Sequence, residues 1–235
     1  MTDNQFRTAL ITGASRGLGF ALARELAKKG WTLIIDGRNL GALETASKDL
    51  SQYSQVSAVP GDVGENQHRQ ALAEAARELG GLDAVINNAS ILGPSPQPEL
   101  LEYPLDFIEE VFRVNVIAPL AILQAVQDYM RPGARIINIT SDAGLEAYPG
   151  WGGYGSSKAA LEHLSAILAA ENPSWKVYWV DPGDMRTQMQ QEAFPGQDIS
   201  DRPLPETSVP GLLALLEEDL PSGRYLARQV KVEVA

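Results

Sequence analysis

The chain has 235 residues, a length that suits one large α/β domain or two small ones. With 44% hydrophobic residues it can bury a substantial core, and without cysteine it has neither disulfides nor thiolate metal sites. The net charge of −11 argues against binding to nucleic acid or anionic membranes, which needs clustered lysine and arginine. Because no stretch is apolar for long enough to cross a membrane and MTDNQFRTAL lacks a secretory apolar core, we expect a cytoplasmic protein.

The first predicted unit is a strand, a glycine-rich turn and a helix. Residues 6–12 form an apolar run typical of a buried strand, and residues 18–29 have the apolar spacing of a helix that Gly30 ends. Between them, residues 12–19 read TGASRGLG. Such a turn lets the backbone approach a phosphate, and the helix N-terminus offers it free N–H groups. The unit therefore predicts a dinucleotide pyrophosphate site, with a plain tight turn as the alternative.

The end of the second predicted strand, residues 32–36, bears on the choice of cofactor. A residue here faces the adenosine ribose in dinucleotide-binding folds. If that residue is Gly37, Arg38 comes next and meets a 2′-phosphate with its planar guanidinium, and Arg16 can approach the same phosphate. If it is Asp36, the ribose diol of NAD is favoured. We expect NADP(H) to be preferred over NAD(H).

Strands and helices continue to alternate along the chain. Further strands are predicted at residues 56–59, 84–86, 135–140, 176–180 and 223–226, and further helices at 40–50, 65–79, 105–130, 154–171 and 206–218. This alternation predicts an α/β fold with a doubly wound parallel sheet and helices on both faces, in a single domain. The assignment of the tail, residues 229–235, stays open.

Two positions of the 65–79 unit are ambiguous. Asp62, in the loop before it, is a candidate partner for the adenine amino group, or else the N-cap of the helix. His68 is expected on an exposed helix face. Neither His68 nor His163 has a partner at metal-ligand spacing, so no metal site is expected.

The predicted helix 105–130 contains Asn115 and, four residues later, Pro119. Proline lacks the N–H that would bond the carbonyl of Asn115. That carbonyl is therefore free to bind another partner, such as a water, unless the helix merely kinks there.

Candidate catalytic residues lie within residues 140–158. Ser141 follows the 135–140 strand, and Tyr154 and Lys158 are four residues apart, hence on one face of a helix. A lysine cation favours phenolate, so we expect it to lower the pKa of Tyr154 from about 10 toward neutrality. Tyrosine is then a usable proton donor or acceptor, and the serine hydroxyl holds a carbonyl or alcohol oxygen. A surface tyrosine and a solvated lysine are the alternative.

Ligands of open parallel sheets bind beyond the carboxyl ends of the strands. We therefore expect the glycine turn, Arg38, Asp62, Asn88 and Ser141 to converge on one edge of the sheet. Residues 187–205 are polar and without periodicity, and are predicted to form a flap over this edge.

These motifs together resemble the short-chain dehydrogenase/reductase family along nearly the whole chain. The matching residues are 12–19 (TGxxxGxG), Asp62-Val63, Asn87-Asn88-Ala89, Asn115, Ser141, Tyr154 with Lys158, and Pro182-Gly183 with Thr187. The resemblance implies a Rossmann-type sheet of about seven strands and hydride transfer to or from NAD(P). It also implies that Tyr154 exchanges the proton, Ser141 orients the substrate oxygen, Lys158 binds the nicotinamide ribose, and Asn115 holds a water.

The motifs and the resemblance define three predicted sets of site residues. The catalytic set is Asn115, Ser141, Tyr154 and Lys158. The cofactor-binding set is Gly13, Ser15, Arg16, Gly17, Leu18, Gly19, Gly37, Arg38, Asn39, Asp62, Val63, Asn88, Ala89, Tyr154, Lys158, Pro182, Gly183, Met185 and Thr187. The substrate set is Ser141, Trp151 and Tyr154.

The sequence therefore predicts an NADP(H)-dependent carbonyl reductase, or its reverse, acting on a small molecule. Residues 146–154 resemble carbonyl reductases of the sepiapterin-reductase type. The alternatives are a non-enzymatic NADP(H) sensor that binds a partner protein, and an epimerase or dehydratase. A homodimer through the 105–130 and 154–171 helices and a homotetramer are both open. The chain departs from the family in Ser90, where glycine is usual, and in lacking a glycine-rich ending.

Overall fold

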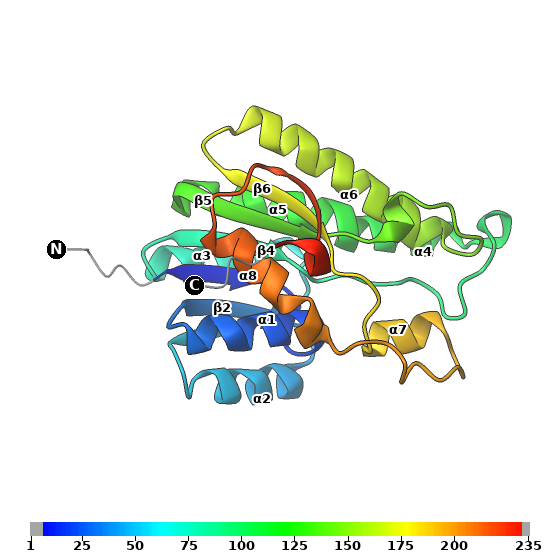
Figure 1. The fold of residues 1–235 in the computed structure, drawn as a ribbon, viewed down its shortest axis with the longest axis horizontal. Helices are drawn as coiled ribbons and strands as arrows, with labels where there is room; N and C mark the ends of the chain where they lie inside the picture. The colour runs from blue at the N-terminus through cyan, green and yellow to red at the C-terminus, as the bar shows by residue number, and fades with distance from the viewer. Residues whose placement is uncertain (1–6, 232–235) are drawn as a thin grey trace.

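The computed structural model describes residues 7–231, which contain a seven-stranded parallel sheet (Figure 1). The strand order is β3-β2-β1-β4-β5-β6-β7. The strands are β1 (Thr8–Ile11), β2 (Thr32–Gly37), β3 (Val56–Pro60), β4 (Leu82–Asn87), β5 (Met130–Ile139), β6 (Lys176–Asp181) and β7 (Gly223–Leu226). This Rossmann-type architecture confirms the predicted fold class.

Helices cover both faces of the sheet. They are α1 (Gly17–Lys28), α2 (Leu40–Leu50), α3 (Asn66–Glu78), α4 (Leu105–Phe112), α5 (Ala118–Val126), α6 (Gly152–Glu171), α7 (Gln188–Ala193) and α8 (Val209–Glu217). Helices α1, α2 and α8 pack on one face, and α3, α5 and α6 pack on the other (Figure 1). Within residues 7–231, none of the helices is both long and apolar enough to cross a membrane.

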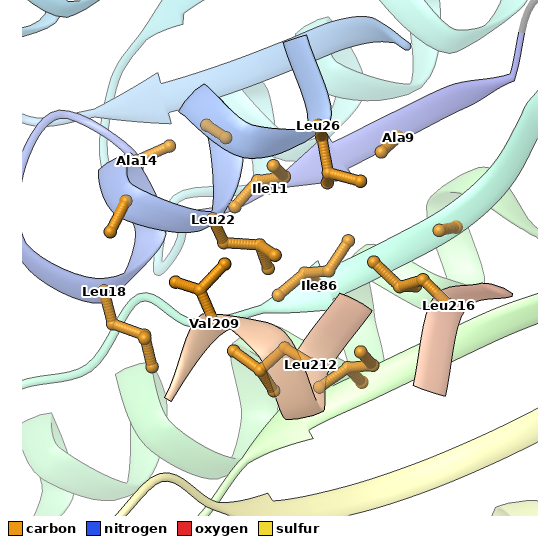
Figure 2. Packing of buried hydrophobic residues seen from close by; sticks show 14 of the residues in the cluster. Ala9, Ile11, Ala14, Leu18, Leu22, Leu26, Ile86, Val209, Leu212 and Leu216 are labelled. Atoms are coloured by element: carbon orange, nitrogen blue, oxygen red, sulfur yellow. The ribbon is translucent and has the colours of Figure 1, made fainter. Parts of the chain in front are cut away.

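The two faces are built by alternate residues of each strand, since successive strand side chains point in opposite directions. Ile11 of β1 and Ile86 of β4 face α1 and α8, whereas Leu10 and Val85 face α3 and α5. Figure 2 shows the first cluster, where Leu22 and Leu26 of α1 interdigitate with Val209, Leu212 and Leu216 of α8 over the strands. This packing fixes α1, whose N-terminus follows the glycine turn.

The order of the strands reverses between β1 and β4. The chain builds outward from β1 through β2 to β3, then returns to pair β4 with the other side of β1. Loops that leave β1 and β4 therefore diverge at this switch point, which is where open α/β sheets bind ligands.

Several predicted elements differ from the observed ones. The predicted helix 105–130 is divided into α4, a π-helical stretch (Arg113–Ile117) and α5, and Met130 already begins β5. The Ala118 N–H bonds the Arg113 carbonyl five residues back, as a π-turn requires. Pro119 lies in the first turn of α5, where its missing N–H is tolerated.

The segment 187–205 is also more ordered than its sequence predicts, since it contains the short helix α7. The Thr187 side chain accepts a hydrogen bond from the Gln190 N–H and so caps this helix. Because residues 187–205 show no helical periodicity, the sequence does not predict a helix there, although Thr187 is a capping residue. Phe6 of the first predicted strand and residues 232–235 of the tail lie outside the described residues.

Candidate active site

The glycine turn presents the uncapped start of α1. Gly13 and Gly17 have φ angles of 65° and 58°, a region that favours glycine. Gly19 is closely packed, because a Cβ there would lie 2.6 Å from the Gly13 carbonyl oxygen. The N-cap residue, Arg16, makes no side-chain capping bond, so the first N–H groups of α1 remain available to an anion.

Asp36, at the end of β2, is turned inward. One carboxylate oxygen accepts the Gly13 N–H (2.6 Å), and the other lies 2.9 Å from His68 Nε2. The prediction of an exposed His68 is wrong, since the residue is 7% exposed and faces β2. The pattern of apolar residues in α3 does not indicate that His68 has a polar partner in Asp36, 32 positions earlier in the chain. Arg38 is exposed and lies 3.9 Å from Asp62.

Asp62 does not cap α3. Its carboxylate accepts the Gly64 N–H (2.7 Å), and the N-cap position belongs to Glu65. Asn88, after β4, donates its amide to the carbonyls of Thr12 (2.8 Å) and Gly13 (3.1 Å). The Asn88 side chain therefore holds the glycine turn to the neighbouring strand.

Asn115 is buried, and its side-chain amide is fully used within the protein. The amide nitrogen donates to the Ile91 carbonyl (2.9 Å) and to Ser157 Oγ (3.0 Å). The amide oxygen accepts from Ser90 Oγ (3.0 Å) and from the Ile91 N–H (2.9 Å). Ser90, where the family usually has glycine, thus adds one hydrogen bond to this network.

Tyr154 and Lys158 lie together on the buried side of α6. Lys158 is 2% exposed and donates to the Ile139 carbonyl (2.8 Å) at the end of β5. Its Nζ lies 5.4 Å from the centre of the Tyr154 ring. Ser141 follows β5 and donates to Asp142 Oδ1 (2.9 Å). Strand β5 and helix α6 thus bring Ser141, Tyr154 and Lys158 to one place.

Burial is the largest influence on the pKa values of Tyr154 and Lys158. It raises the pKa of Tyr154 above its ordinary value of 10.0, and the Asp181 and Asp142 carboxylates act in the same direction, whereas the neighbouring Ser141 hydroxyl acts in the opposite one. Burial also lowers the pKa of Lys158 to about 7. The expected lowering of the tyrosine pKa is therefore wrong for the protein alone. Removal from water disfavours the charged form of both groups.

An aromatic cluster centred on Trp151 lies beside Tyr154. The centre of the Trp151 ring lies 5.8 Å from that of Tyr154, 6.0 Å from Phe194 and 6.5 Å from Tyr148. Leu92 and Met189 belong to the same apolar cluster. Tyr148 was missed by the sequence reasoning, although an aromatic residue six positions before Tyr154 was a usable signal.

A cavity of about 1350 Å³ joins the glycine turn to Tyr154. Twenty of the predicted site residues line it: Gly13, Ser15, Arg16, Gly17, Leu18, Gly37, Arg38, Asn39, Asp62, Val63, Asn88, Ala89, Ser141, Trp151, Tyr154, Lys158, Pro182, Gly183, Met185 and Thr187. Gly19 and Asn115 lie behind its wall. Within the described part of the chain, no group of three or more histidines and carboxylates is placed to hold a metal.

The cavity fits an extended dinucleotide. One end has the uncapped helix start for a pyrophosphate, and Arg38 lies beside it. The other end has Lys158, of whose three ammonium donors one bonds Ile139, which leaves donors for ribose hydroxyls. These residues suit the two ends of a nicotinamide dinucleotide.

The family model for short chain dehydrogenases matches residues 7–198 of the chain. The sepiapterin reductase of Mus musculus is 34% identical over 78% of this chain and 76% of that protein. The rhamnolipids biosynthesis 3-oxoacyl-[acyl-carrier-protein] reductase of Pseudomonas aeruginosa is 36% identical over 70% of this chain, and the alignment spans 66% of that protein.

A solved structure extends the similarity over the whole fold. It is a short chain dehydrogenase from Shigella flexneri complexed with NADP, with a TM-score of 0.84 and 26% identity. The match covers 97% of this chain and 100% of that chain.

Proposed function

Because the chain belongs to the short-chain dehydrogenase/reductase family, we propose that it is an NADP(H)-dependent oxidoreductase that reduces an aldehyde or ketone to an alcohol, or catalyses the reverse. The observation that carries this proposal is the single cavity shared by the glycine turn and by Ser141, Tyr154 and Lys158. A nucleotide-binding end and a proton-transfer end face the same space. The bound nicotinamide would supply or accept the hydride.

Tyr154 is proposed as the proton donor and acceptor. Burial raises the pKa of its phenol, so the group is protonated at neutral pH and ready to give a proton to a nascent alkoxide. Ser141 would orient the reacting oxygen by a hydrogen bond once its hydroxyl turns from Asp142. Lys158 would hold the nicotinamide ribose, where fresh hydrogen bonds offset the cost of burying its charge.

The preference for NADP(H) is supported by the end of β2. One carboxylate oxygen of Asp36 accepts the Gly13 N–H and the other contacts His68, whereas Arg38 is exposed beside the cavity. A guanidinium suits a 2′-phosphate, and an inward carboxylate neither binds a ribose diol nor repels the phosphate. The relative from Shigella flexneri with bound NADP points the same way.

The proposed substrate is a hydrophobic or aromatic carbonyl compound. Trp151 lies beside Tyr154, Phe194 packs against Trp151, and Leu92 and Met189 add apolar surface. Phe194 follows α7, so the proposed flap, residues 187–205, would close over the substrate.

We also propose a homodimer through α4, α5 and α6. Leu105, Phe107, Leu120 and Ile167 on these helices are large apolar residues that remain exposed in the single chain. A second copy would cover them. Sedimentation equilibrium should give twice the mass of the chain, and a monomer at micromolar concentration would contradict this proposal.

The decisive experiment is NADPH oxidation by the purified protein against aldehydes, ketones, diketones and quinones, with NADH in parallel. Turnover that is faster with NADPH is expected. Faster turnover with NADH would overturn the cofactor preference alone. Tight nucleotide binding without turnover on any substrate would instead favour a nucleotide sensor.

A further inference from the structure

One buried titratable pair takes no part in the proposed proton and hydride transfers. His68 of α3 and Asp36 of β2 have side chains that are 5% and 1% exposed, and their polar atoms lie 2.9 Å apart. Burying such a pair costs solvation free energy, which good geometry and additional hydrogen bonds must offset. The second Asp36 oxygen supplies one such bond, from the Gly13 N–H at 2.6 Å.

The pair joins strand β2 to two loops that border the cavity. Asp36 binds the glycine turn after β1 through Gly13 N–H, and its own carbonyl accepts the Ala14 N–H (3.0 Å). His68 packs beneath the loop after β3, since a Cβ added to Gly61 would lie 2.2 Å from His68 Nδ1. The imidazole is therefore held from both sides, by the carboxylate and by the Gly61 backbone.

This arrangement decides where the Asp36 carboxyl group lies. Asp36 borders the cavity, yet both of its carboxylate oxygens are engaged within the protein, by the Gly13 N–H and by His68. The neighbouring acid, Asp62, is bound to the Gly64 N–H and faces Arg38. Without the imidazole, one Asp36 oxygen would be buried without a partner, and rotation toward the cavity would relieve that cost.

We infer that His68 is a positioning residue for cofactor choice: it holds the Asp36 carboxylate against the Gly13 N–H and away from the adenosine ribose, leaving the 2′ side of the ribose to Arg38. This inference rests on the proposed NADP(H) function. According to this inference, His68 controls which nucleotide binds, although it lies on α3, outside the glycine turn and the end of β2.

The test compares dissociation constants for NADPH and NADH, measured by nucleotide fluorescence, in the wild type and its variants. In His68→Leu the freed carboxylate should repel a 2′-phosphate and accept ribose hydroxyls, so the preference for NADPH should fall at least about tenfold. Asp36→Asn/His68→Leu removes that charge and should restore the preference. His163→Leu changes an exposed histidine and should leave the preference as in the wild type.

Asp36→Asn alone covers the case in which His68→Leu does not fold, because asparagine is nearly isosteric and keeps an oxygen for Gly13. With Asp36 turned inward, this variant should bind NADH as the wild type does. NADH binding weakened about tenfold would mean that Asp36 holds the ribose diol, and would overturn the inference.

The other outcomes separate the inference from the proposed function. An equal loss of affinity for both nucleotides in His68→Leu would reduce His68 to a structural role and leave the NADP(H) function standing. A wild type that prefers NADH would overturn the inference but keep an oxidoreductase. A wild type that binds neither nucleotide would remove the proposed function and the inference together.

Discussion

At the scale of single residues, the proposed chemistry depends on two groups that are kept out of water. Tyr154 is 9% exposed and Lys158 is 2% exposed, and burial shifts both pKa values toward the neutral forms. A neutral phenol is a proton donor, which suits the reduction of a carbonyl. A lysine with a pKa near 7 is partly neutral until a partner such as a ribose hydroxyl or phosphate favours its cation.

Tyr154→Phe removes the proposed acid while it keeps the ring packed against Trp151. Turnover of NADPH with the best carbonyl substrate should fall by about 10²- to 10⁴-fold, the usual contribution of general acid catalysis. The dissociation constant for NADPH should stay within about threefold of the wild type, since the hydroxyl is at the substrate end of the cavity. Steady-state kinetics and a fluorescence titration measure the two quantities.

Tyr148→Phe is the matched control, because it removes a hydroxyl from the same aromatic cluster, one that donates to Asp142 Oδ2 (3.1 Å). It should keep most of the activity. Full turnover in Tyr154→Phe would refute the role of Tyr154.

Lys158 should make stability depend on pH. Burial lowers its pKa from 10.5 in the unfolded chain to about 7 in the folded protein. Between these values the unfolded chain binds the extra proton, so the free energy of unfolding rises with pH by up to about 1.4 kcal/mol per unit. Below about pH 7 both states hold the proton, and the cost of the buried charge is fully present.

Lys158→Met lacks this titration. The melting temperature of the wild type minus that of the variant should therefore increase between pH 7 and pH 9 and change little between pH 5 and pH 6. Differential scanning calorimetry of both proteins in the same buffers cancels the titration of other groups. A difference that does not change up to pH 9 would mean that Lys158 is solvated as an ammonium.

At the scale of elements, strands and most helices could be predicted because each carries its own signal. The helix 40–50 and the strand 223–226 have the predicted bounds in the structure. The π-helical stretch before α5 has no periodic signature, since Pro119 marks only that a regular helix cannot continue unchanged. Helix α7 depends on one capping threonine, which composition alone does not reveal.

The glycine turn and α1 act as one element, which makes Gly19 a sensitive position. A Cβ there would lie 2.5 Å from Asn88 Nδ2 and 2.6 Å from the Gly13 carbonyl oxygen. Gly19→Ala should therefore displace the turn, lower the free energy of unfolding by about 1–3 kcal/mol and weaken NADPH binding at least tenfold. Urea denaturation and nucleotide titration measure the two effects.

Gly41→Ala is the matched control within a helix. Its nearest neighbour would be Asn39 Oδ1 at 3.7 Å, an ordinary contact, so alanine should raise stability by roughly 0.5–1 kcal/mol through helix propensity. If both variants behaved alike, close packing at Gly19 would not control the turn.

At the scale of the whole molecule, the sheet topology explains why a linear sequence could indicate a common site. Residues at the ends of β1, β2, β4, β5 and β6 are far apart in the chain, but a parallel sheet brings all these ends to one edge. The sequence does not reveal which side chains near that edge contact one another. The Asp36–His68 contact joins residues 32 positions apart, and the packing of α3 against β2 is what brings them together.

Because the cavity borders most strand ends, a bound dinucleotide should stabilise the entire domain. A ligand at 100 times its dissociation constant adds about 2.7 kcal/mol to the free energy of unfolding. For a chain of this size that corresponds to a melting temperature higher by about 5–10 °C. NADPH should produce this rise, and NADH at the same concentration should produce a smaller one.

Arg38→Ser should reduce the rise with NADPH to that with NADH, because the guanidinium is proposed to bind only the 2′-phosphate. Lys48→Ser, which removes an exposed cation from the neighbouring helix α2, controls for the change in net charge. Thermal unfolding with each nucleotide over a concentration series distinguishes the cases, because stabilisation by mass action grows with the logarithm of ligand concentration. Equal rises with NADPH in the wild type and in Arg38→Ser would place the 2′-phosphate elsewhere, with Arg16 as the next cation along the cavity wall.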